Sequence, residues 1–80
     1  MSGYHLKKIK KGKLGEPSKI QEELDELIDA IEQNNRIMAL VELSDLYGAL
    51  KAVAESLGSN MEELKIMQEA TERAFKSGKR

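Results

Sequence analysis

Apolar residues recur at helical spacing in three successive segments of this chain. In the first segment they lie three or four positions apart, as on one face of an amphipathic helix, and they are Ile20, Leu24, Leu27, Ile28 and Ile31. Pro17 and Ser18 mark the start of this helix, and Ser18 and Gln21 have the spacing of a capping box. Asn34 and Asn35 then interrupt the pattern, which predicts a short turn between two antiparallel helices.

The second segment, from about Arg36 to Leu57, is apolar on nearly every side. Its apolar residues are Ile37, Leu40, Val41, Leu43, Leu46, Tyr47, Leu50, Val53 and Leu57. A helix that is apolar all round is a buried helix, and a chain of 80 residues is too short to bury it alone. We therefore expect a homodimer or homotetramer in which a partner subunit covers part of this helix. Gly58 follows the segment, as expected at a helix C-terminus.

The third segment begins at Ser59, which forms a second capping box with Glu62. Its inward stripe is expected at Met61, Leu64, Met67, Thr71 and Phe75. The residues before the first helix contain several glycines and no sustained stripe, so we expect an irregular arm. The sequence thus predicts an all-α fold, a short bundle of three helices with its core completed by oligomerisation. The arm covers residues 1–17 and the helical domain covers residues 18–80.

Charge is nearly balanced over the whole chain but uneven along it. The formal net charge is −1, yet lysines crowd the arm at Lys7, Lys8, Lys10, Lys11 and Lys13. Such an arm either contacts the phosphates of a nucleotide or a nucleic acid, or it is a solvated tail. The one histidine, His5, lies in this irregular arm and is expected to be incidental rather than a general base.

Composition also bears on the compartment. The chain contains no cysteine, which excludes disulfides and thiol catalysis and fits a reducing compartment. No apolar run approaches the ~20 residues of a membrane-spanning helix, and the N-terminus lacks the apolar stretch of a signal peptide. We expect a cytoplasmic protein with no membrane partner.

Two acidic clusters lie on consecutive predicted helices. Residues three apart are neighbours on a helix surface, so Glu23 with Glu26, and Glu42 with Asp45, each bring two carboxylates to one place. Burying carboxylates without a compensating charge is costly, and hard oxygen ligands suit Mg²⁺, Ca²⁺ or Mn²⁺. Either such a cation lies between the clusters, or lysine or arginine side chains from a neighbouring helix pair with them.

The other acids of the first helix have a simpler interpretation. Asp25 and Asp29 are expected to form a solvated face. Glu22 belongs either to that face or to the groups that support a metal site. Tyr47, on the apolar second helix, is expected in the core rather than against a nucleotide base.

The acidic clusters also match a family pattern. EELDE at residues 22–26 and ELSD at residues 42–45, separated by fifteen positions, resemble the EExxE and ExxD motifs of the all-α nucleoside triphosphate pyrophosphohydrolases. This superfamily includes MazG-like proteins, dimeric dUTPases and phosphoribosyl-ATP pyrophosphohydrolase. The resemblance covers residues 18–57 well and the third helix only loosely.

The resemblance implies a concrete site and reaction. It implies that Mg²⁺, or alternatively Mn²⁺, is held by Glu23, Glu26, Glu42 and Asp45. Glu22 would orient water or support the ligands, and Glu22 and Glu23 would be the catalytic acids. The implied reaction converts a nucleoside or deoxynucleoside triphosphate to the monophosphate and pyrophosphate.

Basic residues that contact the pyrophosphate are harder to assign from the sequence. The basic motif of the family's third helix is not cleanly present. Lys19, one turn before Glu23, and Arg80 are expected to contact the substrate. Lys65, Arg73 and Lys76 are further candidates on the third helix.

Two alternative functions remain at this point. One is hydrolysis of phosphoribosyl-ATP in histidine biosynthesis, which uses the same fold and chemistry. The other is a non-catalytic helical dimer that binds nucleic acid through its lysine arm. Nucleic-acid binding is the less expected function, because it gives no reason for four carboxylates to converge.

Overall fold

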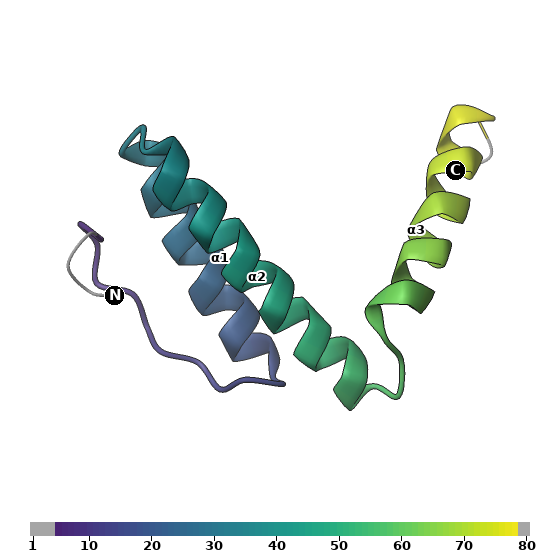
Figure 1. The fold of residues 1–80 in the computed structure, drawn as a ribbon, viewed down its shortest axis with the longest axis horizontal. Coiled ribbons are helices and arrows are strands. Elements are labelled where there is room, and N and C mark those ends of the chain that lie inside the picture. The colour runs from purple at the N-terminus through teal and green to yellow at the C-terminus, as the bar shows by residue number, and fades with distance from the viewer. Residues whose placement is uncertain (1–4, 79–80) are drawn as a thin grey trace.

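The computed structural model describes residues 5–78, and its regular structure consists of three helices (Figure 1). Helix α1 spans Pro17–Glu32, α2 spans Arg36–Ser56 and α3 spans Met61–Lys76. The predicted all-α fold, with three helices after an irregular arm, is confirmed. Within residues 5–78, none of these helices combines the length and the hydropathy of a membrane-spanning segment.

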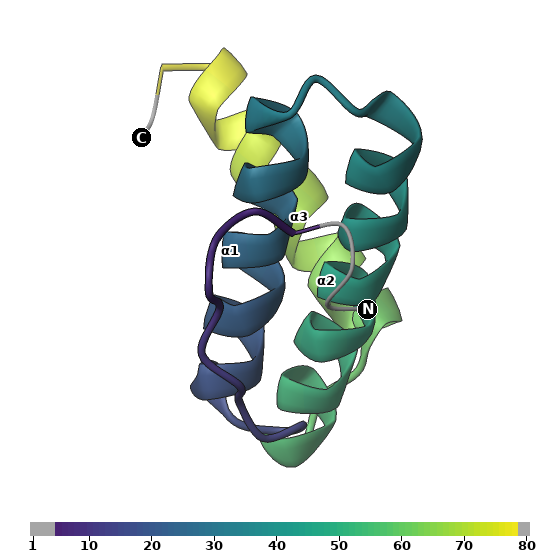
Figure 2. The same ribbon diagram turned by 90° about the vertical axis from the view of Figure 1, so that its left-hand side faces the viewer.

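Helices α1 and α2 form an antiparallel hairpin, and α3 extends from one end of it. The two helices of the hairpin lie side by side in both views (Figures 1 and 2). Helix α3 starts near the C-terminal end of α2 and leans away from the hairpin, so far fewer of its residues approach α2 (Figure 1). The bundle is therefore a two-helix hairpin with a third helix attached at one end.

The turn between α1 and α2 uses the two predicted asparagines. Asn34 adopts a left-handed conformation with φ of +58°, which asparagine tolerates better than most residues. Asn35 caps α2, because its side-chain oxygen accepts a hydrogen bond from the N–H of Met38 at 3.0 Å. Gly58, with φ of +81°, follows the end of α2 as predicted.

The predicted capping box at the start of α1 is wrong. The N-cap position is Glu16, which makes no side-chain capping bond within the described part of the chain. The hydroxyl of Ser18 instead accepts a hydrogen bond from the N–H of Lys13 at 3.0 Å. Pro17 occupies the first turn, where its missing N–H costs the helix nothing.

At α3 the cap lies one residue later than predicted. The side-chain oxygen of Asn60 accepts a hydrogen bond from the N–H of Glu63 at 2.8 Å. The Ser59 hydroxyl donates to the carboxylate of Glu63 instead of capping the backbone. Asparagine is as good a cap as serine, so sequence alone did not distinguish the two neighbours.

The arm over residues 5–16 runs back along the hairpin rather than into solvent (Figure 2). The N–H of Leu6 donates to Asp29 of α1 at 3.1 Å. Gly12 lies so close to α1 that a Cβ atom there would come within 2.1 Å of the carbonyl oxygen of Ser18, so only glycine fits. The described arm is thus docked on the hairpin and is not a free tail.

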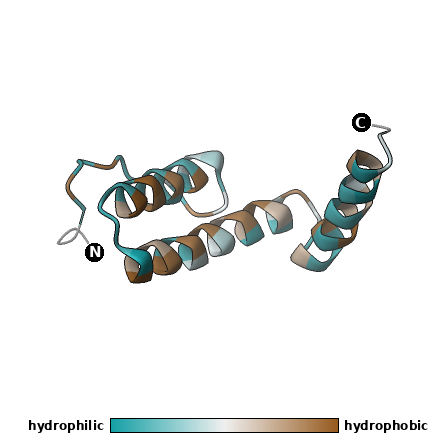
Figure 3. Cartoon of the chain, turned by 90° about the horizontal axis from the view of Figure 1, so that it is seen from above, coloured by the Kyte–Doolittle hydropathy of each residue, from teal (hydrophilic) through white to brown (hydrophobic). Residues whose placement is uncertain are grey.

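The interior of the hairpin is small and only partly apolar. Its buried apolar residues are Leu27, Ala30, Met38, Ala49 and Ala54. Part of the apolar stripe of α1 stays uncovered, since Leu24, Ile28 and Ile31 are 37%, 42% and 59% exposed although Leu27 is buried. Figure 3 shows apolar positions, in brown, along the whole length of both helices.

Helix α3 leaves its predicted inward stripe largely uncovered. Leu64, Met67 and Phe75 are exposed, and Met61 and Thr71 are half-buried. The prediction that this stripe packs inward is therefore wrong for the single chain. The physical reason is the angle at which α3 leaves α2 (Figure 1).

The observed caps predict that Asn35 contributes more than Ser18 to the free energy of unfolding. Asn35→Ala should lower the free energy of unfolding by about 1 kcal/mol, because it removes the N-cap of α2. Ser18→Ala should change it by less than about 0.5 kcal/mol, because Ser18 does not cap α1. Urea denaturation followed by circular dichroism measures both. An equal loss in the two variants would contradict the assigned caps.

Candidate metal centre

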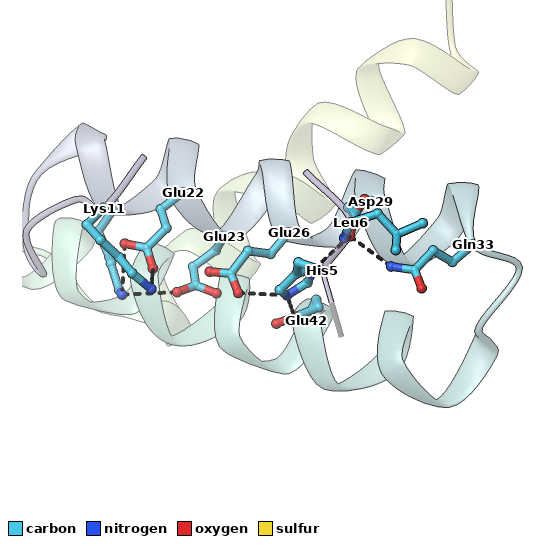
Figure 4. A network of polar contacts seen from close by, with 10 residues as sticks. His5, Leu6, Lys11, Glu22, Glu23, Glu26, Asp29, Gln33 and Glu42 are labelled. Carbon is cyan, nitrogen blue, oxygen red and sulfur yellow. Dashed lines mark hydrogen bonds and ion pairs between the residues drawn. The ribbon is translucent and has the colours of Figure 1, made fainter. Parts of the chain in front are cut away.

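The face of α1 that meets α2 and the arm is acidic. Its acids lie three or four positions apart or adjacent in sequence, which places them on one side of the helix. They are Glu22, Glu23, Glu26 and Asp29, and each is between 2% and 7% exposed. Glu42 approaches them from α2 and is 2% exposed (Figure 4). The expectation that Asp29 lies on a solvated face is wrong, and of the two interpretations of Glu22 the burial excludes the solvated face.

Three overlapping groups of side chains bring potential metal ligands together among the described residues. One group joins the two helices and consists of Glu23, Glu42 and Asp45. A second consists of Glu22, Glu23 and Glu26, and a third contains Glu26 and Glu42 with a histidine. Within each group the ligand atoms lie no more than 4.8 Å apart.

All four predicted metal ligands therefore belong to this cluster. Glu23, Glu26 and Glu42 are buried in it, whereas Asp45 lies exposed at its edge. No single group among the described residues contains all four acids, but Glu23, Glu26 and Glu42 each belong to two groups and so link them.

One carboxylate oxygen in the cluster is buried without a hydrogen-bond partner in the described structure, Oε2 of Glu23. The other oxygen of Glu23, Oε1, lies 3.1 Å from the ammonium of Lys19. A buried acceptor without a partner loses its hydration and gains nothing in return. A cation next to Oε2 would satisfy it, and the all-oxygen set around Glu23 suits Mg²⁺ or Mn²⁺.

Lysines and a backbone N–H compensate one end of the cluster. The ammonium of Lys19 lies 3.2 Å from Glu22 as well as near Glu23, and that of Lys11 lies 3.7 Å from Glu22. The N–H of Gly12 donates to Glu22 at 2.7 Å. The predicted substrate contact Lys19 thus lies at the site, on two of its acids. The predicted alternative, in which lysines pair with the buried acids, is thus found for Glu22 and Glu23. The lysines come from α1 itself and from the arm, not from a neighbouring helix.

His5 compensates the other end, which the sequence did not indicate. Its Nδ1 lies 2.9 Å from Asp29, and its Nε2 lies 2.9 Å from Glu26 and 2.7 Å from Glu42 (Figure 4). The imidazole is only 6% exposed. Asp29 also accepts a hydrogen bond from Gln33 at 2.8 Å. The expectation that His5 is incidental is therefore wrong.

The middle of the cluster favours bound protons. Burial, followed by the negative charge of Glu23, raises the pKa of Glu26 above its ordinary value. Burial, followed by the negative charge of Glu26, raises the pKa of Glu42 in the same way. Burial opposes the charged form of His5, but its hydrogen bonds to Asp29 and Glu42 outweigh burial and raise its pKa above 6.5.

The ends of the cluster favour ionised acids. Burial tends to raise the pKa of Glu22, but the Gly12 N–H and Lys19 outweigh burial and lower it. Burial also tends to raise the pKa of Asp29, but the hydrogen bond with His5 contributes to a net lowering of that pKa. Negative charge is thus stabilised at both ends and in excess between them.

A pocket of about 360 Å³ lies beside the cluster, under the arm. The residues that line it are His5, Leu6, Lys7, Lys8, Ile9, Lys11 and Glu26. Three arm lysines therefore surround a space that opens next to a buried carboxylate. The pocket combines positive charge from the arm with negative charge from α1.

The remaining predicted site residues lie elsewhere. Arg80 is outside the described residues. Lys76 pairs with Glu72 within α3 at 2.9 Å. Tyr47 is 57% exposed, contrary to the expected core position, and it lines a pocket of about 530 Å³ with Lys65 and other residues of α3.

A comparison with protein-family models finds no match to this chain, and none was found among curated proteins or among solved structures. The resemblance to the pyrophosphohydrolase motifs therefore stays a prediction. The geometry of the cluster has to support any function by itself.

The raised pKa of His5 predicts how stability depends on pH when divalent cations are removed. Because the folded pKa lies above the ordinary value of 6.5, the stabilisation is fully present below pH 6.5 and is lost as the pH rises through the folded value. The raised pKa values of Glu26 and Glu42 act with the same sign. The melting temperature with a chelator should thus fall above pH 6.5, and it should fall less steeply in His5→Ala. Parallel curves for the two proteins would contradict the assigned shift.

Proposed function

We propose that the protein is a Mg²⁺-dependent nucleoside triphosphate pyrophosphohydrolase. The observation that carries the proposal is the convergence of buried carboxylates from α1 and α2 around an oxygen of Glu23 that has no partner in the described structure. A helix that needed only stability would gain from apolar residues at these positions. Acids retained there at a cost in free energy suggest a bound cation.

The ligands in this proposal are the acids of the two helices. Glu23, Glu42 and Asp45 hold the metal, and Glu26 completes the set from the next turn of α1. When bound, Mg²⁺ neutralises the polyphosphate and lowers the pKa of a water molecule. Glu22 stays ionised beside Lys19, and we assign it the role of orienting the attacking water.

The pocket under the arm receives the phosphates. Lys7, Lys8 and Lys11 line it together with Glu26, one of the proposed metal ligands. Negative phosphate oxygens would thus meet positive side chains beside the metal site. Water adds across the anhydride bond between the α and β phosphates, and the monophosphate and pyrophosphate leave. Preorganised positive charge stabilises the pyrophosphate as its charge increases.

The alternatives can be separated by assay. Phosphoribosyl-ATP contains the same bond, so a panel of triphosphates with and without this compound, scored for pyrophosphate rather than phosphate, identifies the substrate. Nucleic-acid binding through the arm is less favoured, because it gives no reason for the carboxylates of α1 and α2 to converge.

Substitution of the ligands tests the proposed reaction. Glu42→Gln and Asp45→Asn should each lower Mg²⁺-dependent pyrophosphate release by at least about 100-fold, because each removes a charge that holds the metal. Asp25→Asn is the matched control, because Asp25 bonds to Gln21 on α1 away from the cluster. Its activity should stay within about twofold of the unsubstituted protein. Unchanged release in either ligand variant would exclude the proposed site.

We also propose that a second copy of the chain covers the exposed apolar face. On α1 this face consists of Leu24, Ile28 and Ile31, and on α2 it includes Leu40 and Leu43. Five buried apolar residues form too small a core for a chain of this length. Two hairpins joined through these faces make a four-helix bundle, in which each apolar face meets an identical one.

A charge on this face should separate the copies. Ile28→Glu should halve the mass measured by light scattering and lower the melting temperature, because a buried carboxylate without a partner is costly. Lys51→Glu is the control, because Lys51 is exposed at a polar position of α2. It should leave the mass unchanged. A monomeric unsubstituted protein, or equal masses for all three proteins, would contradict the assembly.

A further inference from the structure

The geometry points to a second cation site, built from His5, Glu26 and Glu42, that binds a divalent transition-metal ion such as Co²⁺, Mn²⁺ or Zn²⁺. The site shares two carboxylates with the proposed Mg²⁺ centre and adds a nitrogen ligand from the arm. It goes beyond the hydrolase proposal, because metal binding here does not require any activity toward nucleotides.

The first argument is the direction of the imidazole. A carboxylate can only accept a hydrogen bond, so Nδ1 of His5 carries the proton that faces Asp29 at 2.9 Å. The other ring nitrogen, Nε2, then faces Glu26 and Glu42 at 2.9 Å and 2.7 Å. In the metal-free protein a shared proton makes the hydrogen bond between Nε2 and Glu42 at 2.7 Å. A divalent cation between the three groups would take the place of that proton, and Nε2 would then offer it a lone pair.

The second argument is the way in which the ring is held. A histidine that binds a metal commonly donates its other N–H to a carboxylate, which sets the tautomer and the ring orientation. Asp29 does this for His5. Asp29 is itself held by the N–H of Leu6 and the side chain of Gln33, and it is 2% exposed. The structure thus contains the support of a metal ligand as well as the ligand.

The third argument is the spacing of the donor atoms. Adjacent ligands of an octahedral ion with bonds of about 2.1 Å lie about 3.0 Å apart. Nε2 of His5 lies 2.9 Å and 2.7 Å from the two carboxylate oxygens, so only a small outward movement opens space for an ion. The ligand atoms of all three residues already lie within 4.8 Å of one another.

An independent observation shows that one buried carboxylate of the cluster is incompletely compensated. Glu23, next to Glu26 in the cluster, has an oxygen without a partner in the described structure (Figure 4). A protonated His5 can therefore compensate only part of the buried negative charge. A divalent ion carries twice the charge of an imidazolium, and it would replace the proton at Nε2 while His5 stays in place as a ligand.

The donor set selects the class of ion. Mg²⁺ and Ca²⁺ prefer oxygen ligands, whereas imidazole nitrogen suits Zn²⁺, Co²⁺ and the other first-row ions, with affinity rising from Mn²⁺ along the row. The all-oxygen group of Glu23, Glu42 and Asp45 is suited to Mg²⁺ by the same rule. The two overlapping groups thus differ in the ion that they prefer.

Titration of the metal-free protein with Co²⁺, without nucleotide, tests the site. Calorimetry and the visible absorption of Co²⁺ report binding, and Mg²⁺ is titrated in parallel. His5→Ala should weaken Co²⁺ binding at least about tenfold, with Mg²⁺ binding unchanged or stronger. Lys13→Ala is the matched control, because Lys13 is an arm residue that pairs with Glu16 and lines neither the cation site nor the pocket beside it. It should leave Co²⁺ binding unchanged.

Two further readouts keep the test decisive if His5→Ala loses helical structure by circular dichroism. Asp29→Asn retains the imidazole and should weaken Co²⁺ binding by about 10- to 100-fold, because the ring loses its orienting carboxylate. Pulsed electron paramagnetic resonance of bound Mn²⁺ should detect a histidine nitrogen in the unsubstituted protein. Co²⁺ binding that is equal or tighter in both variants, with no nitrogen coupling to Mn²⁺, would show that His5 is only an ion-pair partner.

The outcome separates this site from the proposed function. Pyrophosphate release with Mg²⁺ together with Co²⁺ binding that does not depend on His5 overturns only the second site. His5-dependent Co²⁺ binding in a protein that hydrolyses none of the triphosphates overturns only the hydrolase assignment.

Discussion

The structure depends on the negative charge buried between α1, α2 and the arm. A carboxylate that leaves water needs a cation or a hydrogen-bond donor in place of its hydration. Gly12, Lys19 and His5 supply these groups to the acids of the cluster. The arm is docked because the acids require donors, and the acids are tolerated in the interior because the arm covers them.

The same constraint leaves an apolar face uncovered. The covered side of α1 carries Glu22, Glu23, Glu26 and Asp29 beside the apolar Leu27 and Ala30. With this side inward, Leu24 and Ile28 remain exposed, and the interior of the hairpin stays small. The site and the proposed assembly of two copies are thus consequences of one choice, the rotation of α1 about its own axis.

The arrangement also suggests how charge serves chemistry. Glu26 lines the pocket together with arm lysines, and it belongs to the cluster of acids from both helices. A complex of a metal with a polyphosphate needs both kinds of charge close together. His5 adds a nitrogen at the edge of that set. A cation bound there would hold the arm to both helices through a single side chain, so metal binding and arm docking would support each other.

Local spacing in the sequence determined the three helices, the turn at Asn34, and the pairing of neighbouring acids, because a helix brings residues three or four apart together whatever surrounds it. The sequence could not decide which side of α1 faces α2, because that depends on what covers each side. It gave no signal for His5 either. The contacts of His5 span 24 and 37 positions, and an irregular segment has no periodicity from which its path can be read. Only the tertiary structure, by folding the arm over the acids, decided that this histidine belongs to the site.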